Sequence, residues 1–370
     1  MKELVIFCES YSLIKNCLYL VRQDYQKRSI AIVIPGNRDL FKFFGEIKEK
    51  FFDSSVNIIY FEAFEGGKTA GGTMAQIIYR IPEIVREKRY LREIFHDHMT
   101  QVTGADVYFF ARTAAQVTLY LLEKLVRNNR LVFMQNENQL IDVTKHPSAG
   151  IKDLVSLAIM KLTYGRNLGM VKHPAYLRGL PYISDNFIAL KVDKVIDLEE
   201  GNKMMVDFDL GRFNMLDTSG YSIIYFDDSL VETGYVADKD IFWRELSDIF
   251  DILSSHFPPD KIARKYHPFL TTDKAIIRVG EVLPDFIPAE LLYNKNVKLY
   301  LSVASNSIVN VEEGKVVSLI NLVTLSNGEL TKRTKESLIQ RSHSEILFPQ
   351  SLDEFERILI DLKGQSDLKR

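Results

Sequence analysis

The chain has 370 residues, which is too long for one ordinary domain and sufficient for two, each with a core of its own. Its 47 lysines and arginines nearly balance its 49 aspartates and glutamates, so no bulk cationic field exists to hold a nucleic acid backbone. We therefore expect two lobes and no nucleic acid partner.

The N-terminal residues MKELVIFCES predict a buried strand rather than a targeting segment, because acidic residues flank a short apolar run. Cys8 and Cys17 have the spacing of neither a zinc site nor a disulfide framework, and are interpreted as buried thiols of a reducing compartment. No stretch is long and apolar enough to span a bilayer. We expect a cytoplasmic protein. The basic segment 83–93 leaves contact with the inner face of the membrane open, and scattered aromatic residues leave room for a homodimer face.

Short apolar runs recur in the first 135 residues, with amphipathic stretches between them. The runs predict strands that are covered on both faces and pair in parallel, at 3–9, 29–36, 56–64, 105–112 and 130–135. The stretches between them carry apolar residues at spacings of three and four, as helices on a sheet do. This alternation predicts a Rossmann-type α/β domain.

The second half repeats the pattern. It predicts strands at 221–226, 261–266, 275–281 and 297–303, and helices at 238–256, from Pro288, and at 352–363. The segment from about 175 to 218 has an antiparallel character, and we place the domain connection at its end. The predicted domains are therefore 1–218 and 219–370. Ligands of open parallel sheets bind at the carboxyl ends of the strands, so a cleft between the domains is the expected site.

The sequence KYHP places His267 at the end of a predicted strand, where Pro268 fixes the backbone that follows. An imidazole at this edge would donate a proton to a leaving phosphate. His-Pro is also a common turn dipeptide, and the chain has two more, His146-Pro147 and His173-Pro174. The dipeptide taken alone therefore favours a plain turn, and only the surrounding motifs favour a function for His267.

Two polar motifs follow. In FIPAELL, Pro288 and Glu290 fall in a first helical turn, where a carboxylate caps its own helix or binds ribose hydroxyls. In SVASNS, residues Ser305, Asn306 and Ser307 emerge at a strand end that should meet a helix, and small hydroxyls there suit phosphate oxygens. A plain turn is the commoner role of such residues taken alone.

Other candidates are weaker. EGGKTAGGT at 65–73 lacks Walker spacing, and the HDH sequence at 96–98 is interpreted as a solvated helix end. Asp227 and Asp228 follow a predicted strand, where an acidic pair caps a helix more often than it holds a divalent ion. We predict no metal site.

The order of these motifs resembles the bacterial sialyltransferase and polysialyltransferase families of GT-B fold, which act in capsule and lipooligosaccharide synthesis. The resemblance covers residues 221 to 310 well, through His267-Pro268, the IPxE stretch ending at Glu290, and the hydroxyl motif. The family's acidic motif would follow the strand at 130–135, where this chain reads Asn136-Glu137-Asn138. The family's motif consists of two acidic residues followed by glycine. Asn138 stands where that glycine would be, and asparagine tolerates the left-handed backbone conformation that glycine usually adopts.

The resemblance implies an α/β protein of GT-B type, with two Rossmann-like doubly wound domains that face a central cleft. Residues 1–218 would form the acceptor side and residues 219–370 the nucleotide-sugar side. The implied reaction is inverting transfer of a nonulosonic (sialic-type) acid from a CMP-sugar to a glycan or glycolipid acceptor, without metal or other cofactor. Glu137, or Asp142 as second choice, would be the base and His267 would assist the departing CMP. Donor binding would fall to the set Pro268, Pro288, Glu290, Ser305, Asn306 and Ser307.

Two alternatives remain open. The same fold would serve another donor, such as CMP-Kdo or a UDP-sugar, because the motifs indicate phosphate binding more clearly than they indicate which nucleotide base is bound. A non-catalytic partner in capsule assembly is the other alternative, because the acidic motif keeps only one carboxylate, that of Glu137.

Overall fold

The chain divides into two compact units, Met1–Asp209 and Leu210–Arg370, here called the N-terminal and C-terminal units. The boundary predicted from the sequence, after residue 218, falls a few residues later. The structure, a computed structural model, describes residues 3–62, 81–110, 116–135, 158, 161, 168–170, 182–184, 188–190, 192–267 and 279–367.

The N-terminal unit contains a six-stranded parallel sheet in the order β3-β2-β1-β4-β5-β9. All five strands predicted for the first 135 residues are present, and their parallel pairing is confirmed. The sixth strand corrects the prediction, because β9 lies in the segment interpreted as antiparallel and instead pairs with β5 in parallel. The strands are β1 (Leu4–Phe7), β2 (Ile30–Pro35), β3 (Val56–Phe61), β4 (Asp106–Phe109), β5 (Arg130–Met134) and β9 (Lys194–Ile196).

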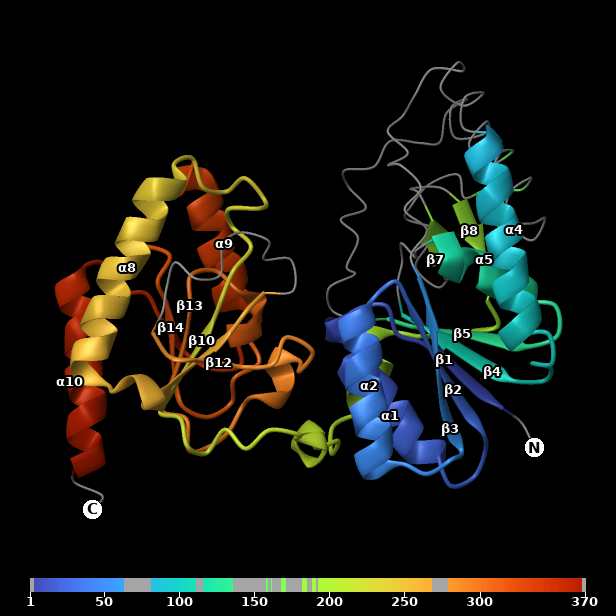
Figure 1. Cartoon of the computed structure of the whole chain (residues 1–370), viewed down its shortest axis with the longest axis horizontal. Coiled ribbons are helices and arrows are strands. Elements are labelled where there is room, and N and C mark those ends of the chain that lie inside the picture. The colour runs from blue at the N-terminus through green and yellow to red at the C-terminus, as the bar shows by residue number, and fades with distance from the viewer. Residues whose placement is uncertain are drawn as a thin grey trace. The chain divides into compact units, whose positions relative to one another are not determined.

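Helices cover both faces of this sheet, as the apolar strands require. Figure 1 shows α1 and α2 on one side and α4 and α5 on the other, and residues of α4 and α5 share a core with β1 and β4. Cys8 and Cys17 are buried within this unit, as predicted. The helices are α1 (Ile14–Asp24), α2 (Arg38–Phe51), α4 (Ile81–His98), α5 (Gln116–Leu125) and α7 (Leu198–Met204), with a 3₁₀ turn η1 (Tyr11–Leu13).

A second, small sheet in this unit is antiparallel. Its order is β6-β8-β7, from β6 (Leu168–Met170), β7 (Tyr182–Ser184) and β8 (Ile188–Leu190). Both β6 and β7 pair with β8 in antiparallel fashion. The antiparallel prediction for the segment after residue 175 is thus correct for β7 and β8, and wrong for β9.

The C-terminal unit repeats the doubly wound plan with six parallel strands in the order β12-β11-β10-β13-β14-β15. The prediction of two Rossmann-like doubly wound α/β domains is confirmed by the strand order within each unit. The strands are β10 (Ile223–Phe226), β11 (Ile262–Lys265), β12 (Glu281–Val282), β13 (Leu299–Ser302), β14 (Lys315–Ser318) and β15 (Ile346–Leu347). The helices are α8 (Lys239–His256), α9 (Gly328–Arg341) and α10 (Leu352–Asp367), with 3₁₀ turns η5 (Leu210–Phe213), η6 (Pro259–Lys261), η7 (Ala289–Leu291) and η8 (Asn306–Ile308).

Helices α8 and α10 pack side by side against this second sheet (Figure 1) and fill its core with Leu246, Phe250 and Phe355 among others. Trp243, one turn into α8, packs edge-on against Phe242 at the margin of that core. Asp238 caps α8 through the amides of Asp240 and Ile241, which explains why the helix begins where the sequence predicts.

Gly314, in the turn before β14, has a φ of +97°, and a Cβ atom there would lie 2.9 Å from the carbonyl oxygen of Val297. We expect Gly314→Ala to lower the free energy of unfolding by roughly 1–3 kcal/mol, through the strained φ and this clash. Denaturant titration followed by circular dichroism measures the loss. Gly328→Ala is the control, since a Cβ there meets open space at the start of a helix; equal midpoints for the two variants would contradict the argument.

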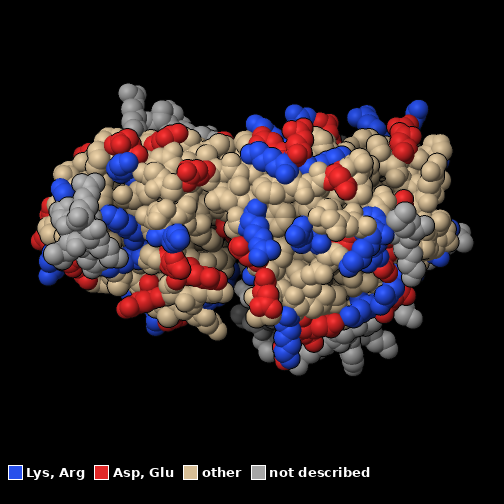
Figure 2. Space-filling view, turned by 90° about the horizontal axis from the view of Figure 1, so that it is seen from below, with Lys and Arg blue, Asp and Glu red and all other residues tan. Residues whose placement is uncertain are grey.

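On the face shown in Figure 2, basic and acidic side chains lie interspersed rather than gathered by sign. The predicted basic segment 83–93 lies on α4, where Arg89 pairs with Glu93. Within the described part of the chain, no helix combines the length and apolar character that crossing a bilayer requires.

Candidate functional site

The carboxyl edge of the C-terminal sheet brings most of the predicted site residues into one unit. Strand β10 lies between β11 and β13, so the residues that follow these three strands meet at one edge. The chain runs outward from β10 through β11 to β12, then returns to the other side of β10 as β13. The topological switch point of this unit therefore lies between β10 and β13, where open α/β sheets bind ligands.

His267 lies two residues beyond β11 and is half-buried. Burial lowers the pKa of its imidazole below the usual 6.5, and the charge of Lys265 lowers it further, whereas Glu232 acts in the opposite direction. In the free protein the ring is therefore mostly neutral at pH 7. A bound phosphate would favour its protonated form. Pro268 lies outside the described residues.

Lys265, the last residue of β11, is a buried cation that the sequence analysis did not single out. Its ammonium group donates hydrogen bonds to the carbonyl oxygens of Asp285, at 3.0 Å, and Tyr266, at 3.2 Å. Its charge acts on both His267 and Glu290. Backbone carbonyls thus hold this ammonium group at the edge of the sheet, close enough to His267 and Glu290 to affect the pKa of both.

Pro288 and Glu290 differ from the prediction. The expected helix is only the 3₁₀ turn η7, with Pro288 as its N-cap, and its Leu291 and Leu292 amides already bond within the turn. The prediction of a helix from Pro288 is therefore wrong. Glu290 is half-buried, and burial raises the pKa of its carboxyl although Lys265 acts against the shift.

The hydroxyl motif forms a tight turn after β13. The buried Ser305 side chain accepts a hydrogen bond from the Ser307 amide at 3.2 Å and donates one to the Ser307 hydroxyl at 3.1 Å. The Ser305 amide in turn bonds to the hydroxyl of Ser302 at 3.0 Å. Asn306 is exposed and accepts from Arg341 at 3.0 Å. The predicted helix after this strand is only the three-residue turn η8.

Asp227 and Asp228 each have a protein partner. Asp227 forms a buried ion pair with Arg264 at 3.1 Å. Asp228 accepts hydrogen bonds from the amides of Val303, at 2.9 Å, and Ala304, at 3.1 Å. The expected helix cap is wrong, because the next helix, α8, is capped by Asp238. The acidic pair joins β10 to both neighbouring strands.

The predicted base lies outside the described residues. Strand β5 ends at Met134, and Asn136, Glu137, Asn138 and Asp142 lie outside the described residues, as does the glycine-rich segment 65–73. The HDH sequence lies at the exposed end of α4, as predicted for a solvated helix end.

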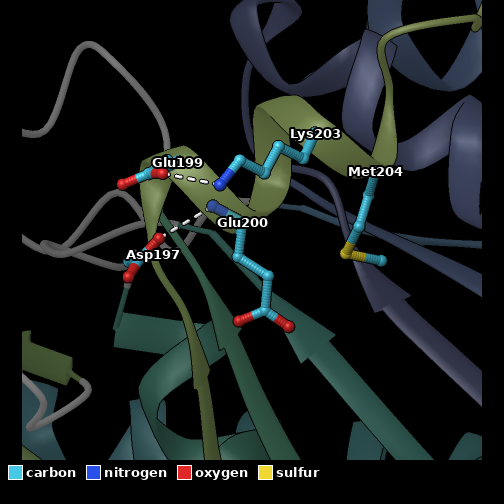
Figure 3. Close-up of a pocket in the computed structure, with 5 residues that line it drawn as sticks. All are labelled: Asp197, Glu199, Glu200, Lys203 and Met204. Atoms are coloured by element: carbon cyan, nitrogen blue, oxygen red, sulfur yellow. Dashed lines mark hydrogen bonds and ion pairs between the residues drawn. The ribbon is translucent and has the colours of Figure 1, made fainter.

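A polar hollow in the N-terminal unit is lined by Asp197, Glu199, Glu200, Lys203 and Met204 (Figure 3). Its charged groups already interact with protein partners. Glu199 pairs with Lys203 at 2.6 Å, and Glu200 pairs with Lys194 at 2.7 Å. Asp197 caps α7 through the Glu200 amide. Since none of the predicted site residues lines it, we place the candidate site at the C-terminal sheet edge.

No family model and no curated protein matches this chain. Among solved structures, a UDP-glucosyltransferase from Polygonum tinctorium capable of glucosylating indoxyl is 12% identical, with 98% of this chain and 89% of that chain covered and a TM-score of 0.43. A putative UDP-N-acetylglucosamine 2-epimerase from Listeria monocytogenes is 9% identical, over 99% and 89% of the two chains, with a TM-score of 0.42. An E. coli heptosyltransferase solved with ADP is 11% identical, over 98% and 100%, with a TM-score of 0.37. Likenesses this remote identify no activity.

Proposed function

We propose that this chain is a metal-independent inverting glycosyltransferase that moves a nonulosonic acid from a CMP-sugar to a glycan or glycolipid acceptor. One observation carries the proposal. His267, the buried cation of Lys265 and the Ser305–Ser307 turn flank β10 at the carboxyl edge of one doubly wound unit. An acid, a cation and hydroxyls at a switch point suit a departing nucleotide phosphate.

Each residue has a role in this proposal. His267, held by Pro268, would protonate the leaving phosphate while Lys265 offsets its charge. Ser307 would donate its hydroxyl hydrogen to a phosphate oxygen, and Ser305, which donates to Ser307, would orient it. Glu290 in the turn after Pro288 would bind ribose. Asn306, exposed on the same turn, would complete the donor site. Glu137, from the N-terminal unit, would take the proton from the acceptor hydroxyl.

A donor with another nucleotide or sugar, such as CMP-Kdo or a UDP-sugar, is the second candidate. The described groups favour it, because a cation, an imidazole and hydroxyls would bind phosphate and ribose. None of them selects one nucleotide base over another. The nucleotide therefore has to be determined by binding.

Calorimetric titration of CMP and then UMP, without added metal, tests the proposal. Wild type is expected to bind CMP in preference to UMP, and His267→Ala is expected to weaken that binding. His343→Ala is the control, because it removes an exposed histidine of the same unit. A preference for UMP would favour the second candidate. Absence of binding to either nucleotide would favour a non-catalytic partner in capsule assembly.

A further inference from the structure

The carboxyl group of Asp228 lies at the switch point of the C-terminal unit. One of its carboxylate oxygens, Oδ2, accepts both the Val303 amide at 2.9 Å and the Ala304 amide at 3.1 Å. Two successive amides at a strand end form the kind of concavity that binds anions in other proteins. Here the chain fills that position with its own carboxylate, directly before Ser305.

The surroundings of Asp228 disfavour the ionised form of its carboxyl group. Burial raises the pKa of its carboxyl to about 7, the charge of Asp227 acts in the same direction, and the two amides oppose the shift only in part. Asp227 is itself paired with Arg264. The side chains offered by the β13 turn, Ser302, Ser305 and Ser307, are neutral. Within the described part of the chain, other titratable groups at this edge include Tyr225 on β10, Glu232, Lys265 and His267 near β11, and Glu290 in η7.

We propose that Asp228 couples phosphate binding to proton uptake: a phosphodiester binds the Ser305–Ser307 turn only when the neighbouring Asp228 carboxyl is neutral. This inference rests on the proposed function, because it uses the same phosphate site. The physical reason is like-charge repulsion in a partly desolvated site, where a carboxylate and a phosphate cannot both ionise without cost. Once neutral, the Asp228 carboxyl has a proton that it can donate to a phosphate oxygen.

The sign of the pH dependence follows directly. Asp228 is charged above its pKa and neutral below it, so affinity falls as the pH rises through about 7. His267 adds a second dependence in the same direction, because its protonated form attracts the anion. A bound anion raises the pKa of His267, so this dependence extends upward from the lowered pKa of the free protein, and variants are needed to separate it from that of Asp228.

The probe is the methyl ester of CMP. Its phosphodiester keeps a constant single charge, whereas the second pKa of a phosphomonoester such as CMP, at about 6, would itself titrate. We expect the affinity of wild type to fall roughly five- to tenfold between pH 6.5 and 8. Calorimetry in buffers of different ionisation enthalpy should show uptake of about half a proton at pH 7.

Asp228→Asn is the informative variant, because the amide oxygen of asparagine accepts the same two amides without the charge. At pH 8 it should bind several-fold more tightly than wild type, and its proton uptake should be smaller by the contribution of Asp228. His267→Gln should keep the fall in affinity as the pH rises through about 7, because Asp228 is unchanged in this variant. Weaker binding by Asp228→Asn at every pH, with its circular dichroism unchanged, would overturn the inference, as would pH-independent binding by wild type. No binding by wild type at any pH would instead overturn the proposed function and this inference with it.

Discussion

His267→Gln is expected to lower the rate of donor cleavage by about 10²–10⁴-fold, the usual contribution of a general acid. Glutamine keeps a polar group at the end of β11 but cannot protonate the leaving phosphate. The release of CMP from a CMP-sugar measures the rate and needs no knowledge of the acceptor. The variant should lose far more turnover than donor affinity, since the proton is transferred in the transition state.

The pH profile distinguishes this chemical role from a structural one. An acid must be protonated, and burial next to Lys265 lowers the pKa of His267 below 6.5 in the free protein. The kcat/KM of wild type should therefore continue to rise as the pH falls below 6.5, and His267→Gln should lack this rise. His343→Gln, at an exposed position, should behave as wild type. A His267→Gln profile of unchanged shape would exclude His267 as the acid.

Asp227→Ala is expected to lower the free energy of unfolding by about 3–5 kcal/mol, because it leaves a buried guanidinium without its carboxylate. The side chains of Asp227 and Arg264 are 5% and 4% exposed, and their atoms are 3.1 Å apart. The Arg264 guanidinium also lies over the rings of Tyr266, at 5.1 Å, and Phe250, at 5.7 Å. Its displacement would disturb the strand end that carries His267. Denaturant titration of the whole chain measures the loss.

The control is a surface pair with the same separation. Glu329 and Arg333 are also 3.1 Å apart, but their side chains are 60% and 73% exposed. Glu329→Ala should therefore cost less than about 1 kcal/mol. The double variant Asp227→Leu with Arg264→Met should recover part of the loss, because apolar side chains can replace a buried pair. Equal losses at Asp227 and Glu329 would show that burial does not govern the pair.

The elements that the sequence predicted are those with a strong local pattern. Strands β1 to β5 and β10 are nearly continuous apolar runs, and α8 combines an apolar stripe with an Asp238 cap. Helix α9 was not among the predicted elements because it buries only Leu338 and carries no apolar stripe. The helix expected after Pro288 failed for a different reason, since a proline fixes where a turn begins but not how far it continues.

The residues of the candidate site also differ in how far the local sequence indicates them. His267, Glu290 and the hydroxyl motif stood out because each lies beside a proline or a run of small polar residues. Asp228 and Lys265 owe their importance to contacts that local sequence does not encode. The Asp228 carboxylate meets an amide 75 residues away, and the Lys265 ammonium meets a carbonyl 20 residues away. These pairings follow from the order of strands in the sheet.

Trp243 gives the C-terminal unit a spectroscopic label of its own. It is the single tryptophan of the chain, and it packs on Phe242 in α8 at the margin of the C-terminal core. Selective excitation of its indole therefore reports on this unit, while far-ultraviolet circular dichroism reports on the helices of both. Emission and dichroism that change at different denaturant concentrations would show that the two units unfold separately. The effects of substitutions at Asp227 and Gly314 could then be assigned to the unit that contains them.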